Sequence, residues 1–457
     1  MNKLTNETLV EQSDLLPRFL RLAIANVVSS VIVPLASTLS IFFLGHLPEI
    51  HHLAGATLAG SLINNLYMVL GFLRTSTTGV TSQAVGRDDR EALLLVVLRN
   101  GIIALVLGVA IVLLQYPLRY LGFALYTVTP EVKASAIAYF HAQIWAAPAI
   151  LLNCVLNGWF LGQEQNGLIL LLSLVGNAAN IALDYLFIVR WGWESTGAGL
   201  SGCISQYLTL LVGLIFFYKQ INWEEVRCVS GKIWDSSALQ STLILNGNIF
   251  VTYLLILFAF IIFDYQSSSM GTITYTENAL LIQIYTLTGY FIGGIGCCTE
   301  TLTGNFKGKG ATNLLVPLLG IAVGSSLLVG LSFTGACVLF PQTVFGLLTN
   351  HTEVTENIDV YVSWLVPVLG FGSIAWMLEG YFSGLAEGHT LRNVSLVAIV
   401  LGFAPIAFVA WQFHSNHLLW LALSLFYAIR MVALAVQLPR TLGSDVEDGI
   451  ALDISKI

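Results

Sequence analysis

Charged residues are scarce in this chain. Only 10% of its 457 residues are Asp, Glu, Lys or Arg, whereas 56% are hydrophobic. A soluble domain carries charge at about a quarter of its positions. The composition therefore excludes an ordinary soluble domain and predicts an integral membrane protein. The net charge of −7 excludes little, because the placement of Lys and Arg matters more than their sum in such proteins.

Cysteine is sparse too, and the common catalytic motifs are missing. The six cysteines form no CxxC pair, so they read as small buried residues and not as a disulfide framework or a metal site. No HExxH, GxSxG or P-loop pattern occurs. We therefore expect no enzyme, no resident metal and no cofactor. Nothing in the sequence indicates a nucleic-acid partner.

Long apolar runs dominate the chain. Windows of about twenty residues, the length that crosses a bilayer as a helix, predict an all-α protein with twelve membrane spans. These spans are 18–43, 53–82, 92–115, 134–161, 167–189, 196–218, 240–263, 273–304, 313–338, 359–386, 391–412 and 418–438.

The loops differ in their content of Lys and Arg. Thirteen of these residues fall on the side of the N-terminus and the even-numbered loops, and three fall on the other side. Positive loops stay in the cytoplasm. The chain is thus predicted to be a multi-pass protein of a prokaryotic plasma (inner) membrane with both termini in the cytoplasm.

One longer connection divides the spans into two sets of six. We expect an N-terminal six-helix bundle at 1–218, a cytoplasmic linker at 219–238, a C-terminal six-helix bundle at 239–440 and a cytoplasmic tail at 441–457. The linker is amphipathic, which suits either a helix on the membrane surface or a plain solvated connection.

The two halves resemble each other at an offset of 222 residues. GWFLGQEQNGLILLLSLV at 158–175 aligns with GYFSGLAEGHTLRNVSLV at 380–397, and the same offset pairs Gly86 with Gly308 and Asn26 with Asn248. Six spans per half make the repeats parallel. Two repeated bundles are the general plan of an alternating-access transporter.

One carboxylate lies inside the fifth span. Asp184 follows Asn180 by four residues and Asn177 by seven, so all three share one helix face. An ionised residue in hydrocarbon is costly, and it usually faces a cavity or a partner because it has a function. We predict a binding or proton-relay role for these three residues; the alternative is a structural hydrogen bond to a neighbouring helix.

Other intramembrane candidates carry weaker signals. Tyr139, His141 and Gln206 are candidates to line a substrate cavity in the same bundle, although ordinary interhelical hydrogen bonds explain them equally well. Pro34 removes a backbone donor from the first span, which predicts either a hinge or a static kink. Glu277 and Glu300 in the eighth span have no role that the sequence assigns.

Several motifs in combination resemble one family of transporters. They are FFLGHLPEIHHLAGATLAG, LGFLRTSTTGVTSQAVGRDDREA, GWFLGQEQN and NAANIALDYLF. Together they resemble the multidrug and toxic compound extrusion (MATE) transporters, and among those the prokaryotic DinF-type branch. The resemblance implies two six-helix bundles in a V shape. It also implies export of drugs or metabolites driven by inward proton or sodium movement.

The resemblance implies cation-coupling roles for Asn180 and Asp184, and two departures from the family pattern remove charge. Relatives commonly carry an aspartate on the first helix where this chain has Ser40 in LSIFFLGHLP. They often carry a charged stretch where it has NGNIFVT at 246–252. Ser40 therefore joins Asn177, Asn180 and Asp184 as a predicted cation-coupling residue.

These observations predict an antiporter that exports amphipathic organic compounds, with a proton as the coupling ion and Asp184 as the protonatable residue. We expect its partners to be a small amphipathic substrate and the lipid bilayer, and the protein to be a monomer. The alternatives are a Na⁺-coupled exporter, a lipid-linked flippase on the same plan, an intramembrane enzyme that uses Asp184, and a transport-dead paralogue with a sensory or scaffold role.

Overall fold

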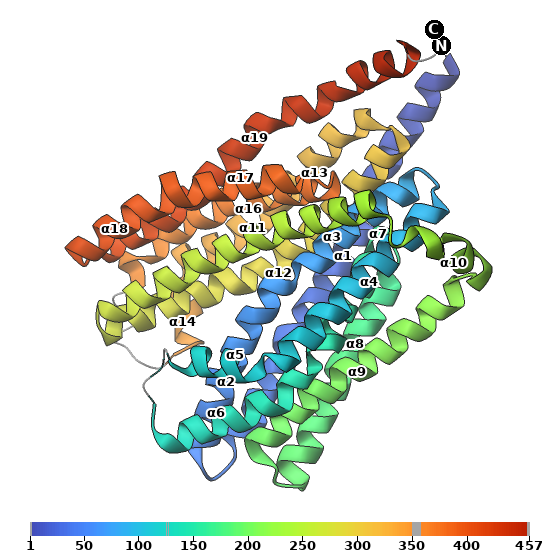
Figure 1. Cartoon of the computed structure of the whole chain (residues 1–457). Helices are drawn as coiled ribbons and strands as arrows, with labels where there is room; N and C mark the ends of the chain where they lie inside the picture. Colours follow the sequence, from blue (N-terminus) through green and yellow to red (C-terminus); the bar gives the residue numbers. More distant parts are fainter. Residues whose placement is uncertain (1, 125, 127, 350–357, 455–457) are drawn as a thin grey trace. The chain divides into compact units, whose positions relative to one another are not determined.

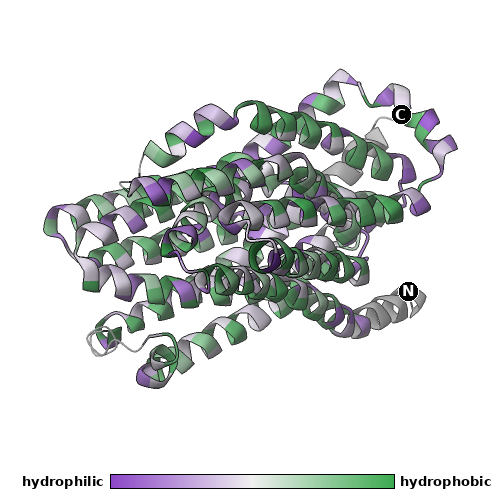
Figure 2. Ribbon diagram, turned by 90° about the horizontal axis from the view of Figure 1, so that it is seen from below, coloured by the Kyte–Doolittle hydropathy of each residue, from purple (hydrophilic) through white to green (hydrophobic). Residues whose placement is uncertain are grey.

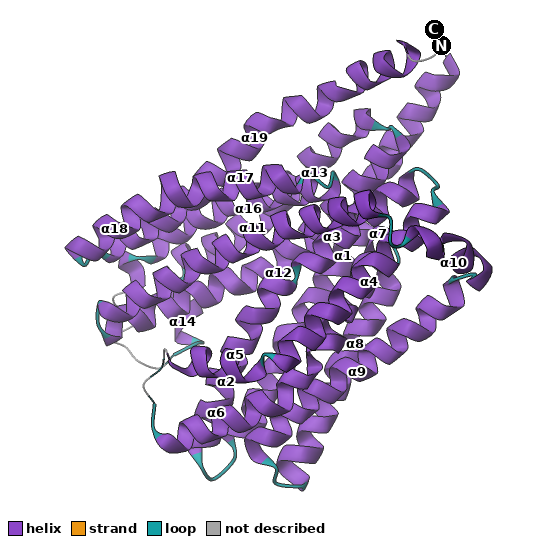
Figure 3. Ribbon diagram, viewed as in Figure 1, coloured by secondary structure: helices purple, strands orange, loops and turns teal. Residues whose placement is uncertain are grey.

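The computed structural model describes residues 2–124, 126, 128–349 and 358–454, with side chains from residue 14 to residue 442 within these ranges. Every regular element in the described chain is a helix (Figures 1 and 3). Twelve helical segments are long and apolar enough to cross a membrane. Their ends lie within about six residues of the predicted ones, so the predicted all-α membrane fold is confirmed.

The first half of the chain forms the following elements. They are α1 (Asn2–Gly45), α2 (Ile50–Leu70), α3 (Phe72–Gly86), α4 (Arg90–Leu113), α5 (Gln115–Ala124), α6 (Pro130–Gln143), η1 (Ile144–Ala146), α7 (Ala147–Gly162), α8 (Asn166–Asp184), η2 (Tyr185–Arg190), α9 (Glu194–Gln220), α10 (Trp223–Val229) and η3 (Ser230–Lys232). Helices α2 and α3 make one span, and so do α6 with α7 and α8 with η2.

The second half repeats this order. Its elements are α11 (Ser236–Ser269), α12 (Thr272–Lys309), η4 (Thr312–Leu314), α13 (Leu315–Leu339), α14 (Pro341–Gly346), η5 (Ile358–Val360), η6 (Val362–Trp364), α16 (Leu365–Gly384), α17 (Gly388–Val397), η7 (Ala398–Phe403), α18 (Ala404–Phe413) and α19 (Asn416–Ile454). The predicted tail continues as helix α19, and residues 455–457 lie outside the described part of the chain.

The distribution of polarity is that of a protein surrounded by lipid. Hydrophobic residues dominate the helices in Figure 2. Large apolar side chains point outward, as Val106 and Leu113 do on α4, while the hydroxyl groups of Thr77 and Thr78 on α3 are buried. Backbone groups in hydrocarbon need partners within the protein, and helices supply them.

The chain forms two compact units whose limits differ from the predicted boundaries. The N-terminal unit is Leu20–Tyr253, and the C-terminal unit is the first 19 residues together with the chain from Leu254 onward. The predicted linker belongs to the N-terminal unit because it is tied to α4. Arg90 pairs with Glu225 at 3.1 Å, and Lys232 pairs with Glu91 at 2.6 Å.

Two helices are divided between the units for a similar reason. Asn246, near the start of α11, donates to Asn100 of α4 at 2.9 Å, so this part of α11 packs in the N-terminal unit. Arg18 of α1 donates to Asn305 of α12 at 3.3 Å, so the start of α1 packs in the C-terminal unit.

The internal repeat is visible in the packing of each unit. Helix α3 packs on α7 as α12 packs on α16, α4 packs on α7 as α13 packs on α16, and α6 packs on α9 as α16 packs on α19. The turn residues Glu164 and Ala386 are 222 positions apart, and both have φ of 60°. The predicted repeat therefore extends to backbone conformation.

Candidate functional site

Asp184 is the last residue of α8, at the point where the α-helix gives way to the π-helical turn η2. The wider turn shows in the hydrogen bond from the Trp191 amide to the Leu186 carbonyl, five residues back, at 3.0 Å. Single π turns inside α-helices occur frequently at functional sites. The side chain of Asp184 is fully buried.

Two serine hydroxyls hold the carboxylate. Ser40 of α1 donates to one oxygen of Asp184, and Ser201 of α9 donates to the other. Hydrogen bonds to a charged group contribute about 1.5–3 kcal/mol each. Three helices therefore meet at one carboxylate.

Asn180 lies next to both serines. Its Nδ2 donates to Ser201 Oγ at 3.3 Å, and its Oδ1 lies 3.5 Å from Ser40 Oγ. We call Ser40, Asn180, Asp184 and Ser201 the aspartate cluster. It confirms the predicted shared face of Asn180 and Asp184 and brings Ser40 to them.

Each serine of the aspartate cluster also has an acceptor on its own helix. Ser40 Oγ lies 3.3 Å from the Ala36 carbonyl, and Ser201 Oγ lies 2.8 Å from the Ala198 carbonyl. Either hydroxyl can therefore turn from the carboxylate to its own backbone without losing all hydrogen bonding. This choice of acceptor is what a protonation-dependent contact needs.

A group of apolar side chains covers one side of the aspartate cluster, about one helical turn away on each helix. Leu44 of α1, Ile188 of η2 and Ala198 of α9 pack together, and Tyr139 of α6 packs against them. This side of the cluster is apolar, so hydroxyl groups supply the polar contacts of the Asp184 carboxylate. Tyr139, a predicted cavity residue, thus borders the site.

The other predicted residues lie outside the cluster. Asn177 donates to the carbonyl of Ser173 on its own helix at 2.7 Å. Gln206 accepts from Asn153 of α7 at 3.1 Å, which is an interhelical bond of the ordinary kind. Pro34 lies within the unbroken helix α1, where its carbonyl accepts from Thr38 at 2.9 Å.

His141 faces the short helix α5. Its Nε2 lies 2.6 Å from Arg119 Nη1, and its Nδ1 lies 3.3 Å from Gln115 Oε1. Hydropathy alone does not predict α5, so the contact of His141 with this helix was not predicted.

Known proteins share this arrangement of the chain. The model of the MatE family matches residues 26–186 and 249–409, one copy in each half. The DNA damage-inducible protein F of Escherichia coli (strain K12) is 30% identical over 418 residues, which cover 91% of this chain and 90% of that protein. This chain belongs to the MatE family.

More distant relatives agree with this assignment. The probable multidrug resistance protein NorM of Rhizobium meliloti (strain 1021) is 24% identical over 376 residues, 79% of each chain. The outward-facing structure of a multidrug resistance MATE family transporter of the MOP superfamily has the same fold, with a TM-score of 0.81 at 17% identity over 93% of this chain and 96% of that one.

MatE membership confirms the predicted family and its DinF-type relationship. It makes the chain a multi-pass membrane transporter for small molecules and rules out the alternative of an intramembrane enzyme. The coupling ion and the roles of individual residues are matters for the proposal below.

Ser201 is the site residue that the sequence analysis missed. It lies in GLSGCISQ of α9 and is fully buried. A serine in a span is common, and no spacing relates it to Asp184, so only the packing of α9 against α8 reveals it.

The remaining intramembrane charges of this MatE protein lie in other surroundings. Arg99 donates to the backbone carbonyls of Lys232 and Ile233. Arg430, almost wholly buried, pairs with Glu379 at 2.9 Å in the C-terminal unit. Glu277 and Glu300, the two acids that the sequence left without a role, are both buried on α12.

Proposed function

We propose that this MatE transporter is a proton-coupled antiporter that exports amphipathic organic compounds by alternating access, with Asp184 as the protonatable coupling residue. The observation that carries the proposal is the fully buried carboxylate of Asp184, held by hydroxyl groups from two other helices. A buried carboxylate is stable in water-free surroundings only when it is hydrogen-bonded or neutral. It therefore responds strongly to protonation.

The proposed cycle uses the two acceptors of each serine. When Asp184 is ionised, Ser40 and Ser201 donate to it and join α1 and α9 to α8. When Asp184 takes up a proton, it attracts these hydroxyls less, and each can turn to the carbonyl of Ala36 or Ala198. Protonation thus loosens α1 from α8, and release of the proton on the other side of the membrane restores the contact.

Pro34 is the position in α1 at which loss of the contact with Asp184 would change the shape of the helix. It lies six residues before Ser40 in α1 and lacks the backbone N–H that would bond to the preceding turn. We propose that α1 bends there when the contact between Ser40 and Asp184 is lost. We propose that this bending opens the substrate cavity predicted at Tyr139, His141 and Gln206.

A proton suits the aspartate cluster better than Na⁺. Carboxylate, amide and hydroxyl oxygens are suitable ligands for a hard cation. Here, however, both carboxylate oxygens are already in direct contact with hydroxyl groups, and an ion would have to separate them. Na⁺ coupling is the alternative, and the experiment below distinguishes it from proton coupling.

A lipid-linked flippase is less well supported. A pyrophosphate headgroup would need several basic side chains directed at it. The sequence places three arginines within spans, Arg74, Arg99 and Arg430. Arg99 binds backbone carbonyls and Arg430 binds Glu379 instead. An exporter of uncharged or cationic amphiphiles needs no such basic set.

We place the transporter as a monomer in the plasma membrane of a prokaryote, with both termini in the cytoplasm. The excess of Lys and Arg in the loops on the side of the termini supports this orientation. The bacterial origin of the relative that shares 30% identity supports the membrane.

The test is transport of the cationic dye ethidium by the purified chain in liposomes, with proton and sodium gradients imposed separately. The proposal predicts that an inward proton gradient alone drives efflux. Efflux driven only by sodium would replace the proton with Na⁺ as coupling ion. Absence of transport with either gradient, for ethidium and for a panel of cationic amphiphiles, would overturn the proposed function.

A further inference from the structure

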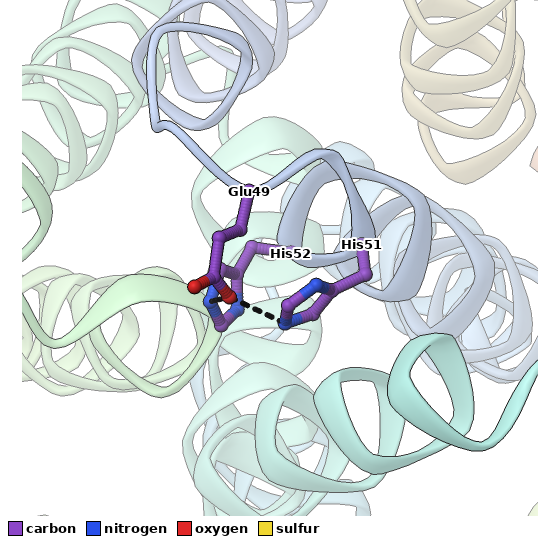
Figure 4. Close-up of side chains that lie close together, drawn as sticks. All are labelled: Glu49, His51 and His52. Carbon is purple, nitrogen blue, oxygen red and sulfur yellow. Dashed lines mark ion pairs between the residues drawn. The ribbon is translucent and has the colours of Figure 1, made fainter.

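Two adjacent histidines lie beside a glutamate at one end of the N-terminal unit (Figure 4). Glu49 precedes helix α2, and His51 and His52 belong to its first turn. Glu49 Oε2 lies 3.1 Å from His51 Nε2 and 3.6 Å from His52 Nε2. The three side chains point toward one another in Figure 4 and can each offer one ligand atom to a metal ion.

A second carboxylate completes the group from a distant part of the chain. Glu194, the first residue of α9, places Oε2 2.9 Å from His52 Nε2. Four ligands at about 2.1 Å in a tetrahedron around Zn²⁺ lie roughly 3.4 Å from one another. The three measured separations lie on either side of that value, and the ligand atoms of Glu49, His51 and His52 all lie within 4.8 Å of one another. Glu194 adjoins this group through His52.

The surroundings of His52 orient its ring for metal binding. Ser195 donates its hydroxyl hydrogen to the His52 carbonyl at 3.2 Å, and the same oxygen lies 3.2 Å from His52 Nδ1. Ser135 Oγ also lies 3.3 Å from His52 Nδ1. Either hydroxyl oxygen can accept a hydrogen from Nδ1, and this tautomer leaves Nε2 for a metal ion. Metal-binding histidines usually donate their other ring N–H in this way.

With the hydrogen on Nδ1, the lone pair of His52 Nε2 faces the carboxylates of Glu49 and Glu194, and a metal ion can lie between them. With the hydrogen on Nε2, the same carboxylates accept a hydrogen bond from the ring instead. The second histidine beside the same carboxylate favours the metal, because imidazole and carboxylate together form a typical zinc ligand set.

We propose that Glu49, His51, His52 and Glu194 form a binding site for a divalent transition metal of the Zn²⁺ type. The bound ion joins the start of α2 to the start of α9. The partly exposed Glu49 and Glu194 give the ion a route in from solution. The site is separate from the aspartate cluster and does not depend on the proposed transport function.

The test uses the full chain in detergent, freed of any affinity tag and of bound metal, and titrated with Co²⁺ alone. The proposal predicts one Co²⁺ per chain with the visible absorption bands of tetrahedral coordination, and displacement of Co²⁺ by Zn²⁺. His51→Ala and Glu194→Gln, at partly exposed positions, should lose these bands. Ser195→Ala should weaken binding about 10- to 100-fold by loosening His52.

His46→Ala is the matched control. His46 is an exposed histidine at the nearby end of α1, and its ring bonds to the Phe42 carbonyl at 2.8 Å. It should bind Co²⁺ as the unaltered chain does, and so should Asp184→Asn. Absence of tetrahedral bands in the unaltered chain, or equal binding by His51→Ala and the unaltered chain, would overturn the site and leave the transport proposal untouched.

Discussion

Ser201 is the residue whose role depends most on the three-dimensional structure. It is buried on α9 and donates to Asp184, yet nothing in its sequence neighbourhood distinguishes it from other serines in the spans. Its hydroxyl and that of Ser40 replace the charge that an additional carboxylate would bring. In the proposed coupling mechanism, the site therefore contains one acid and two hydroxyls.

Replacement of Ser201 by Ala should reduce proton-driven efflux by roughly 10- to 100-fold. A hydrogen bond to a charged group contributes about 1.5–3 kcal/mol, and about 1.4 kcal/mol corresponds to a factor of ten in rate. The measurement is the initial rate of ethidium efflux from liposomes under a proton gradient.

Ser205→Ala is the control for that prediction. Ser205 is also buried on α9, one turn further on, and it donates only to the Gly202 carbonyl, at 2.9 Å, among the described contacts. It should keep the unaltered rate. Equal loss in both variants would mean that any buried hydroxyl on α9 matters, which would contradict a specific role for Ser201.

The sequence predicted part of the aspartate cluster. Helical periodicity related Asn180 to Asp184, and the family resemblance added Ser40. Periodicity also included Asn177, whose amide instead bonds to Ser173 on its own helix. Residues on one helix face share a direction, but only the neighbouring helices decide which of them meet a partner.

Helix α1 forms the first span and carries Ser40 of the aspartate cluster. It runs without interruption from Asn2 to Gly45, with Pro34 inside it. A proline interior to a helix lacks one backbone hydrogen bond and weakens the helix locally. This is the position at which we expect α1 to bend.

Pro34→Ala should slow efflux several-fold while leaving the fold intact, because it restores the missing hydrogen bond and stiffens α1. The measurements are the initial rate of ethidium efflux from liposomes under a proton gradient and the unfolding temperature. Pro439→Ala, at a proline inside α19, serves as the control and should not change the rate. An unaltered rate in Pro34→Ala would rule out the hinge.

The contact of α3 with α7 depends on glycine. A Cβ atom at Gly158 would lie 2.5 Å from the Arg74 carbonyl oxygen, and one at the equivalent Gly380 would lie 2.8 Å from the Gly296 carbonyl oxygen. The repeat therefore preserves a close approach of two helices in both halves. The sequence match at 158–175 and 380–397 reflects this packing.

Gly158→Ala should lower the stability of the protein by about 1–3 kcal/mol, because an added methyl group in a tight contact forces the helices apart. The measurement is thermal unfolding in detergent, read from tryptophan fluorescence. Gly167→Ala, where an added Cβ meets nothing within 4 Å, should not destabilise. A Gly158→Ala variant as stable as Gly167→Ala would contradict the packing argument.

At the scale of the whole molecule, hydropathy alone predicted the twelve spans, because bilayer thickness imposes a long apolar run on each helix. The same method could not predict α5 or α14, which are short helices between spans. Nor could it show that α1 and α11 are each divided between the two compact units. That division follows from contacts such as Asn246 with Asn100, which join residues far apart in the sequence.

The predicted orientation can be tested with a native cysteine. Cys228 in α10 is the exposed one of the six cysteines, and the orientation places it in the cytoplasm. A membrane-impermeant maleimide should label it in inverted vesicles and leave it unlabelled in intact cells. Lys133→Cys, near the start of the fourth span and combined with Cys228→Ser, should show the opposite pattern. Labelling of Cys228 in intact cells would reverse the orientation.

The most direct test of the account is the efflux of ethidium under a proton gradient by Asp184→Asn beside the unaltered chain. Asparagine has nearly the same shape, and its Oδ1 can still accept from one of the two serines. Its Nδ2 can only donate, and the side chain cannot take up a proton. The account predicts that the variant folds normally, shown by its unfolding temperature, and carries no proton-driven efflux. Efflux by a folded Asp184→Asn variant at the rate of the unaltered chain would contradict the role of Asp184.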